Sequence, residues 1–236
     1  MIVHAVIPAA GQGKRLGGET KKQFLELCGL PILIHTLIPF QSASIINEIT
    51  CVVSKEDCSF IEGLVSSHRL DKVKRILHGG ERRQDSVWAA VSELCERSDP
   101  NDLILVHDGV RPLVTTELIE RVAAAAAEVG GAVAARPVTD SLKRVSSGRI
   151  ISQSLPRENV WAMQTPQAFR LSLLREAYQK AETDRFEATD EAMLVERLGH
   201  PIRCVEGSAE NIKITTPPDL RLAEILLHAR GEERRR

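Results

Sequence analysis

The sequence lacks the features of several common classes of protein. Its formal net charge is only −1, so no overall field favours a nucleic acid or a membrane surface. Its five cysteines are odd in number and contain no C-x-x-C pair, and its seven histidines lack metal-ligand spacing. The apolar N-terminus reaches a glycine-rich stretch too soon for a signal peptide or a membrane span. We therefore expect a cytoplasmic protein whose partners include neither nucleic acid nor membrane.

The composition is that of an ordinary globular chain. Charged residues make up 27% of it and apolar residues 43%. A length of 236 residues is enough for one large domain with a substantial core. No internal repeat or linker divides the chain, so we expect a single domain over residues 1–236.

Strand-like and helix-like stretches alternate along the chain. The predicted strands cover residues 2–7, 49–53, 73–77, 103–107, 132–137, 203–205 and 211–215. The predicted helices cover residues 31–40, 60–65, 87–95, 171–181, 191–198 and 216–229, and a further helix is capped by Thr115 or Thr116 and ends at Gly130-Gly131. This alternation favours the α/β class, with a Rossmann-like, mostly parallel central sheet flanked by helices. Pro8 has no N–H to donate, so we expect pairing of the first strand to stop there.

Residues 138–156 interrupt the alternation. Two polar stretches, 141–145 and 149–153, flank Ser146-Ser147-Gly148 and predict a protruding β-hairpin arm. An isolated hairpin is only marginally stable in water, so we expect this arm to pack on another body, with a second subunit as the candidate. Residues 231–236 are predicted to be a disordered tail.

The stretch from Val6 to Phe24 combines a strand end with glycines and cations. Its glycines are interleaved with Lys14, Arg15, Lys21 and Lys22. Such a turn at the carboxyl edge of an α/β sheet can bind a polyphosphate. A flexible surface loop with solvated lysines is the alternative, but the number of glycines and cations favours a polyphosphate cradle.

Two common nucleotide-binding motifs are absent from this stretch. Gly11, Gly13 and Gly17 give G-x-G-x-x-x-G, one residue longer than the dinucleotide fingerprint. Pro8 stands where a P-loop needs its first glycine, and Arg15 where it needs Ser or Thr. What remains, A-A-G-x-G-x-R-L with Lys22 seven residues after the arginine, resembles the signature of nucleotidyltransferases.

Three further segments can contribute to such a site. Asp85 and Ser86 follow Gly79-Gly80 and suit a helix N-terminus, where either simple capping or binding of a base or phosphate is equally expected. Asp108 follows the most apolar strand and can hold Mg²⁺ against a triphosphate, although an Asp-Gly turn is the plain alternative. Lys213 lies in an alternating stretch, where a lysine taken alone is more often an edge gatekeeper than a catalytic group.

Taken together, these segments resemble the 2-C-methyl-D-erythritol 4-phosphate cytidylyltransferase family of the non-mevalonate isoprenoid pathway. The shared motifs keep their order over about two hundred residues. They are A-A-G-x-G-x-R at 9–15, K-Q at 22–23, G-G-x-x-R-x-x-S at 79–86, H-D-x-x-R-P at 107–112, D-S-L-K at 140–143, T-P-Q at 165–167, T-D-E at 189–191 and N-I-K at 211–213.

The resemblance implies a role for each matching residue. Arg15 and Lys22 match the catalytic residues that stabilise the transition state. The positions around CTP are Ala9, Ala10, Gly11, Gly13, Gly80, Glu81, Arg83, Ser86, Asp108 and Gly109, with Asp108 also at the metal. The positions around the acceptor are Arg111, Ser141, Arg157, Thr165, Thr189 and Lys213. The resemblance also implies a homodimer whose arm reaches into the partner, so that each site is shared between subunits.

The chain departs from the family pattern at Lys21, where a proline is frequent, and at Glu81 and Ser141, where some members have Asp and Thr. The last two replacements keep the charge or the hydroxyl. The implied reaction moves CMP from CTP to a polyol phosphate with Mg²⁺, by attack of a phosphate oxygen that needs no general base. Two alternatives are a cytidylyltransferase for another polyol phosphate such as ribitol 5-phosphate, and a non-catalytic CTP-binding protein.

Overall fold

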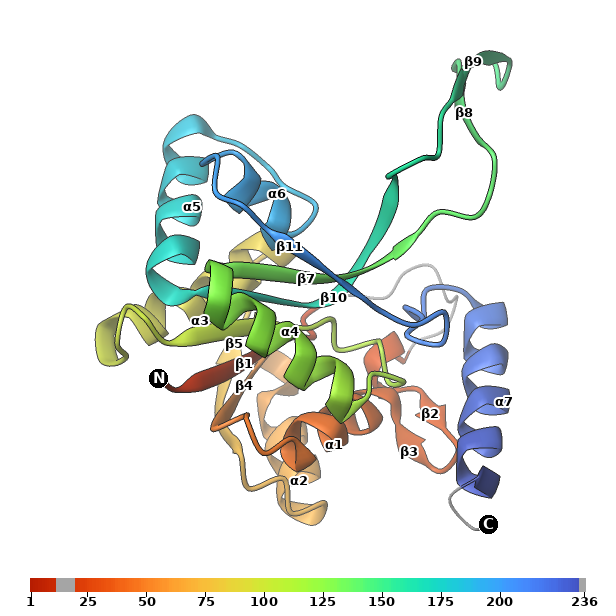
Figure 1. Cartoon of the computed structure of the whole chain (residues 1–236). Helices are drawn as coiled ribbons and strands as arrows, with labels where there is room; N and C mark the ends of the chain where they lie inside the picture. Colours follow the sequence, from red (N-terminus) through yellow and green to blue (C-terminus); the bar gives the residue numbers. More distant parts are fainter. Residues whose placement is uncertain (12–19, 234–236) are drawn as a thin grey trace.

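The computed structural model describes residues 1–11 and 20–233 of the chain (Figure 1). The long strands are β1 (Val3–Pro8), β4 (Glu48–Val53), β5 (Val73–His78), β6 (Leu103–Val106), β7 (Gly131–Pro137), β10 (Trp161–Arg170) and β11 (Arg203–Glu206). The α-helices are α1 (Ile32–Ser42), α2 (Cys58–Ser67), α3 (Arg83–Arg97), α4 (Thr116–Val129), α5 (Leu171–Asp184), α6 (Glu191–Glu196) and α7 (Pro217–Glu233). The smaller elements are η2 (Lys22–Phe24), β2 (Glu26–Leu27), β3 (Leu30–Pro31), η3 (Lys55–Asp57), β8 (Leu142–Val145) and β9 (Ile151–Leu155).

Within the described residues, seven strands form one sheet in the order β11-β7-β10-β6-β1-β4-β5. The pairs β1–β4, β1–β6, β4–β5 and β7–β11 are parallel, whereas β10 runs antiparallel to both β6 and β7. The prediction of an α/β fold with a mostly parallel central sheet is confirmed.

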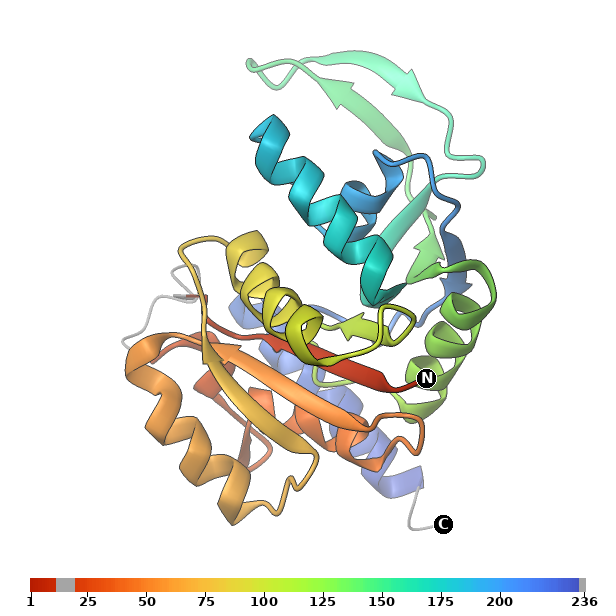
Figure 2. The ribbon, with the colours of Figure 1, turned by 90° about the vertical axis from the view of Figure 1, so that its left-hand side faces the viewer.

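Helices cover both faces of this sheet, and β1 contributes to both sides. Ala5 and Ile7 pack with the buried residues of α1, α2 and α4. Val6 points to the opposite face and packs with α3, α5 and α6, of which α3 and α5 lie together in Figure 2. A strand covered on both faces needs apolar residues at successive positions, which explains the unbroken apolar run of β6 and the run Ala5–Ile7 in β1.

The central strand β10 is not predicted from the sequence. Its buried residues include Gln164, Thr165 and Gln167, so it lacks the apolar alternation from which strands are recognised. Their polar groups find partners from distant segments: Gln167 Nε2 donates to Asp190 Oδ2 at 3.0 Å, and Asn211 Nδ2 donates to the Thr165 carbonyl at 2.8 Å. Tertiary partners therefore make this segment a strand.

The first strand continues one residue beyond its predicted end. Pro8 lies opposite Val52 in the parallel ladder, and the next residue, Ala9, donates its N–H to the Val52 carbonyl at 2.7 Å. Pro8 contributes its carbonyl, which accepts the Gly109 N–H at 3.2 Å. Because Pro8 serves here as an acceptor, its missing N–H does not end the pairing.

The predicted strand over residues 211–215 is wrong. Asn211 and Ile214 are both buried although they are three positions apart, which does not match the two-residue period of a strand face. Ile214 donates its N–H to the Val110 carbonyl at 2.9 Å, so the segment packs along the loop that follows β6. This path brings Lys213 to the carboxyl edge of the sheet.

The arm and the last helix differ from prediction only at their ends. Strands β8 and β9 begin one or two residues later than predicted, and the hairpin projects away from the sheet in Figure 1. Helix α7 continues to Glu233, so residues 231–233 are helical rather than part of a tail. Among the described residues, no helix combines the length and apolar character needed to cross a membrane.

Candidate active site

A cleft of about 660 Å³ opens at the carboxyl edge of the sheet. Its walls come from the loops that follow β1, β4, β5 and β6, together with the segment before α7. They include Ala9, Ala10, Gly11, Lys22, Ser54, Lys55, Glu56, Gly79, Gly80, Glu81, Arg82, Arg83, Ser86, Asp108 and Lys213. Parallel strands bring their carboxyl ends to one edge, so segments far apart in the sequence converge there.

The loop after β1 and the start of α3 meet closely at Gly79. A Cβ at this position would lie 2.5 Å from Ser86 Oγ and 2.8 Å from Ala10 Cβ, so a side chain would separate the two walls. Helix α3 then begins with Arg82 as its N-cap, and Asp85 accepts the Arg82 N–H at 3.2 Å. The predicted helix N-terminus is confirmed, and it lies at the cleft, where a helix start favours a bound anion.

Gln23 fixes the backbone around the glycine-rich stretch. This residue is only 1% exposed, and its Nε2 donates to the Ala9 carbonyl at 2.7 Å and to the Gly11 carbonyl at 3.2 Å. The adjacent Lys22 lines the cleft. Lys21 has a different environment, because its Nζ lies 2.7 Å from both Glu56 Oε1 and Asp57 Oδ2. Lys21 thus stabilises the turn after β4 and is not one of the residues that line the cleft.

A cluster of cations surrounds Asp108. Among the described residues, its carboxylate contacts Arg83 Nε at 3.1 Å, Arg111 Nε at 3.2 Å and Lys213 Nζ at 3.0 Å. Burial alone would raise the pKa of the Asp108 carboxyl, but Arg83, Lys213 and Arg111 outweigh that effect and hold it well below its usual range. Asp108 is therefore ionised, and the cations around it outnumber it.

The two terminal nitrogens of Arg83 bind a second carboxylate. Arg83 Nη1 and Nη2 lie 2.8 and 2.9 Å from the two oxygens of Glu191, a residue that is 1% exposed. Even with Glu191 counted, the described cluster keeps an excess of positive charge. Such a wall suits a polyanionic ligand.

His107 and Thr165 support Asp108 from behind. The Asp108 N–H donates to Thr165 Oγ1 at 3.1 Å, and this oxygen lies 2.9 Å from His107 Nδ1. Burial lowers the pKa of His107 to about 4, so the ring is neutral. The neutral ring donates from Nε2 to the Arg111 carbonyl at 3.2 Å and accepts the Thr165 hydroxyl at Nδ1.

The donor set limits what metal this cleft can hold. The described residues contain no group of three or more His, Cys, Asp or Glu side chains able to hold a metal ion. Asp108 supplies a carboxylate at the cleft, but that carboxylate already contacts Arg83, Arg111 and Lys213. Since Mg²⁺ takes several oxygen ligands, the residues fit a cation that arrives with the oxygens of a bound phosphate.

Comparison with known proteins identifies the family. The model of the 2-C-methyl-D-erythritol 4-phosphate cytidylyltransferase family matches residues 3–229. The chain belongs to this family. The resemblance seen in the sequence and the prediction of a cytidylyltransferase are thus confirmed.

Relatives and solved structures agree over nearly the whole chain. The 2-C-methyl-D-erythritol 4-phosphate cytidylyltransferases of Geobacter metallireducens and Syntrophus aciditrophicus are 44% and 43% identical to it, covering 96% and 95% of this chain and 98% and 95% of theirs. The crystal structure of a 4-diphosphocytidyl-2C-methyl-D-erythritol synthase is 33% identical, with a TM-score of 0.82, over 96% of this chain and 98% of that one. The Thermus thermophilus 2-C-methyl-D-erythritol 4-phosphate cytidylyltransferase is 37% identical, with a TM-score of 0.76 and the same coverage.

The structure brings most of the residues implied by the family pattern into the cleft. Those lining it are Ala9, Ala10, Gly11, Lys22, Gly80, Glu81, Arg83, Ser86, Asp108 and Lys213. Gly109, Arg111 and Thr165 lie around Asp108 without lining the cleft. Gly13 and Arg15 lie outside the described residues.

Three of the predicted acceptor residues lie elsewhere on this chain. Ser141 and Arg157 are exposed at the base of the arm, where Arg157 Nη1 donates to the Thr139 carbonyl. Thr189 is exposed on the loop before α6, with its hydroxyl 3.8 Å from Met193 Sδ. None of these residues lines the cleft of the described chain.

Sequence reasoning assigned no role to Gln23, His107 or Glu191. Each belongs to a motif shared with the family, K-Q, H-D-x-x-R-P or T-D-E, and that membership was the available signal. Their roles depend on partners far along the chain, and the spacing within each motif does not reveal those partners.

Proposed function

We propose that this cleft transfers CMP from CTP to 2-C-methyl-D-erythritol 4-phosphate, giving 4-diphosphocytidyl-2-C-methyl-D-erythritol and pyrophosphate in isoprenoid precursor biosynthesis. The observation that carries the proposal is the cation cluster around Asp108 in a cleft that Lys22 also lines. Both substrates are polyanions, and a cleft with excess positive charge lowers the repulsion between them. Family membership supports the choice of nucleotide and acceptor.

In this reaction an oxygen of the acceptor phosphate attacks the α-phosphorus of CTP. A new P–O bond forms there, and the bond from the α-phosphorus to the bridging oxygen of pyrophosphate breaks. The attacking phosphate oxygen is already anionic at neutral pH, so the site needs no general base. Catalysis then depends on alignment of the substrates and on neutralisation of charge on the α-phosphate.

Each wall of the cleft has a distinct task in this mechanism. The backbone of Ala9–Gly11 and of Gly80 offers close approach to the nucleotide, and the start of α3 favours its negative charge. Lys22, with Arg15 by the family pattern, neutralises charge on the transferring phosphate. Lys213 and Arg111 belong to the acceptor side by the same pattern and are held there through Asp108.

We propose Mg²⁺ as the metal, with Asp108 as its protein ligand and phosphate oxygens of CTP as the others. When bound, the ion would offset charge on the triphosphate. Asp108 is a single carboxylate that already contacts three cations, so it would hold Mg²⁺ only together with phosphate oxygens of the bound nucleotide.

We also propose that the chain works as a homodimer with shared sites. The arm exposes Val145, Ile150 and Ile151, at 50%, 71% and 63% of their surface, and apolar side chains so open to water favour cover by another body. Ser141 and Arg157 match acceptor positions of the family, yet they lie on the arm and not at the cleft of their own chain. A second copy that receives the arm would complete the acceptor site.

The test is a pyrophosphate-release assay with CTP and a panel of polyol phosphates. Release that depends on 2-C-methyl-D-erythritol 4-phosphate supports the proposal. Release that depends on ribitol 5-phosphate instead identifies the related cytidylyltransferase activity. Binding of CTP without release from any acceptor contradicts an enzymatic role and indicates a CTP-binding protein.

A further inference from the structure

A chain of buried polar groups begins behind the cleft and ends at the cleft residues Arg83 and Asp108. Tyr178 of α5 donates its hydroxyl to Glu191 Oε1 at 3.2 Å, and both residues are almost fully buried. Glu191 accepts hydrogen bonds from both terminal nitrogens of Arg83, and Arg83 Nε donates to Asp108 Oδ1 at 3.1 Å. The chain therefore connects helix α5 with the carboxylate at the cleft.

The geometry at Arg83 fixes the plane of its guanidinium. A bidentate pair with a carboxylate sets both position and orientation, and a lysine in its place would provide neither. Burial raises the pKa of Tyr178 well above its ordinary value, and the neighbouring Glu191 raises it further, so the phenol remains a hydrogen-bond donor. Arg83 is thus held at one edge by Glu191 and at the other by Asp108.

Stability alone is a weak reason for this buried ion pair. Replacing such a pair by well-packed apolar residues is often neutral or even stabilising, because both charges lose their hydration. What the pair supplies here is orientation, since Arg83 also lines the cleft.

Glu191 is itself held by the segment before it. It is the first residue of α6, and Asp190 caps that helix by accepting the Met193 N–H at 3.0 Å. Gln167 of β10 holds the same turn, because its Nε2 donates to Asp190 Oδ2 and its Oε1 accepts the Ala192 N–H at 2.9 Å. The central strand therefore sets the position of Glu191.

We propose that Glu191, supported by Tyr178, is a positioning residue of the nucleotide side of the cleft and acts through Arg83. This inference rests on the proposed function, because CTP is the ligand by which it is measured. It assigns a physical role to the T-D-E segment and explains why a carboxylate without access to substrate is buried behind the site.

The experiment is a double-mutant cycle on CTP binding and turnover. The variants are Glu191→Gln, Arg83→Lys and the pair together, with CTP affinity measured by calorimetry and KM measured for each substrate. We expect Glu191→Gln alone to weaken CTP binding about tenfold. In the Arg83→Lys background the same substitution is expected to weaken CTP binding by less than about twofold, because the effects of mutations at contacting residues are not additive. KM for the acceptor is expected to stay unchanged.

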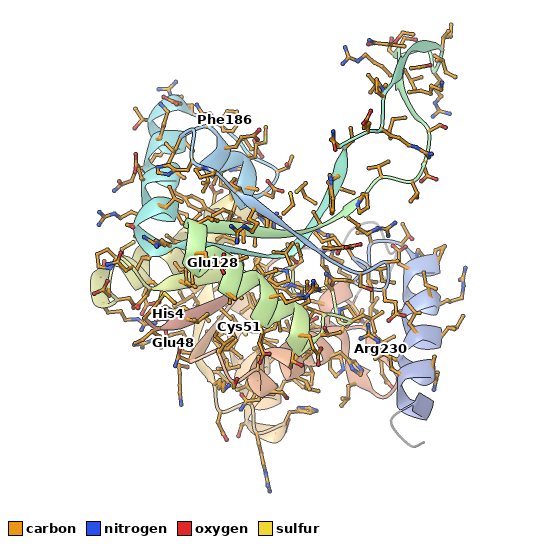
Figure 3. The ribbon with its side chains drawn as sticks, in the orientation of Figure 1. His4, Glu48, Cys51, Glu128, Phe186 and Arg230 are labelled. Carbon is orange, nitrogen blue, oxygen red and sulfur yellow. The ribbon has the colours of Figure 1, made fainter. Side chains whose placement is uncertain are left out.

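Two further variants test folding and specificity. Tyr178→Phe removes a single hydroxyl and is expected to weaken CTP binding about two- to threefold, again only when Arg83 is present. Glu48→Gln is the matched control, because Glu48 also accepts hydrogen bonds from both terminal nitrogens of an arginine, Arg97. Glu48 lies at the start of β4, beside His4 (Figure 3). It is expected to leave CTP binding unchanged.

Several outcomes would overturn the inference. They are equal effects of Glu191→Gln with and without Arg83, a parallel rise in both KM values, or a loss of CTP binding in Glu48→Gln as large as in Glu191→Gln. If Glu191→Gln does not fold, as judged by circular dichroism, the Tyr178→Phe cycle decides. Wild-type protein that binds CTP but releases no pyrophosphate would refute the proposed function, while the calorimetric cycle would still judge the positioning role.

Discussion

At the scale of single residues, the cleft depends on side chains whose charge state the fold has already set. Lys22 lies on its wall, next to a Gln23 that fixes the local backbone through two carbonyls. Asp108 is kept ionised by its cations, and His107 is kept neutral by burial. Each state leads to a distinct expectation.

We expect Lys22→Ala to fold normally and to lower turnover by roughly 10²–10³, the usual effect of removing one donor that acts in the transition state. Pyrophosphate release measures this change, and circular dichroism checks the fold. Lys180→Ala on the outer surface of α5 is the matched control and should retain wild-type turnover. Near wild-type turnover of Lys22→Ala would exclude this residue from the chemistry.

We expect Asp108→Asn to raise the Mg²⁺ concentration needed for half-maximal activity, because it removes a carboxylate from the proposed metal site. The neutral side chain also removes the negative charge that Arg83, Arg111 and Lys213 share. A Mg²⁺ titration of turnover at saturating CTP measures the effect. An unchanged titration curve would place the metal on other groups.

The lowered pKa of His107 leads us to expect a protein that is less stable in acid. Its pKa falls from 6.5 to about 4 on folding, so between these values the unfolded chain binds a proton that the folded chain does not. The free energy of unfolding should therefore decrease as pH falls through this window, by about 3 kcal/mol in total for this group, and level off below it.

Urea denaturation of His107→Asn between pH 7 and pH 4 measures this contribution. The asparagine can still accept the Thr165 hydroxyl, but it has no ring to protonate. Its stability should fall less steeply with acid than that of the wild type, and the surface variant His200→Asn shows the slope that remains with His107 present. Equal slopes in His107→Asn and wild type would refute the expectation.

At the scale of elements, the antiparallel strand β10 joins the two halves of the sheet through close packing across its ladder with β7. Gly131 of β7 lies opposite Phe169 of β10, and a Cβ at Gly131 would come within 2.9 Å of the Phe169 ring. Phe169 is fully buried, so its ring has little room to move. The glycine and the aromatic ring are therefore matched.

We expect Gly131→Ala to destabilise the fold by about 1–3 kcal/mol through this overpacking, and to cost less in a Phe169→Leu background. Urea denaturation of the single and double variants measures both terms. Gly63→Ala in α2 is the matched control, because a Cβ there meets nothing within 4 Å. It should instead stabilise the fold by roughly 0.5–1 kcal/mol, the ordinary gain of Ala over Gly inside a helix. An equal cost of Gly131→Ala in both backgrounds would contradict the packing argument.

At the scale of the whole molecule, the proposed dimer predicts complementation between two weakly active variants. Homodimers of Lys22→Ala and of Arg157→Ala should both be weak, because each copy of the site carries one defect. In a mixed dimer with shared sites, one site collects both defects and the other collects none. Random assembly makes about half of the dimers mixed, so equal co-expression should recover about a quarter of wild-type activity.

Pyrophosphate release per chain after co-expression measures this recovery. Mixing the two variants after separate purification, without exchange of subunits, serves as the control and should give only the mean of the two weak activities. If the co-expressed mixture also gives only that mean, the site is built within one chain and the shared-site proposal is wrong.

The sequence alone determined the fold class, the alternating elements and most of the cleft. Apolar runs such as residues 103–106 and helical spacing such as that of Val87, Val91 and Leu94 depend on neighbours a few positions away, so local pattern reveals them. Glycine-rich turns and the residues after strand ends converge because parallel strands share one carboxyl edge. That rule predicts Gly11 and Asp108 at the same edge, and the family resemblance adds Gly80 to them.

Only the tertiary structure decided the rest, because those features depend on partners far along the chain. β10 forms a strand because its buried polar groups hydrogen-bond with Asp190 and Asn211. Residues 211–215 do not form a strand because they pack against the loop after β6. Lys21 and Lys22 are adjacent in sequence and chemically alike, yet one braces the β4 turn while the other lines the cleft. Whether a lysine faces the cleft or holds the scaffold is set by the segments that the fold brings beside it, and local sequence does not contain that information.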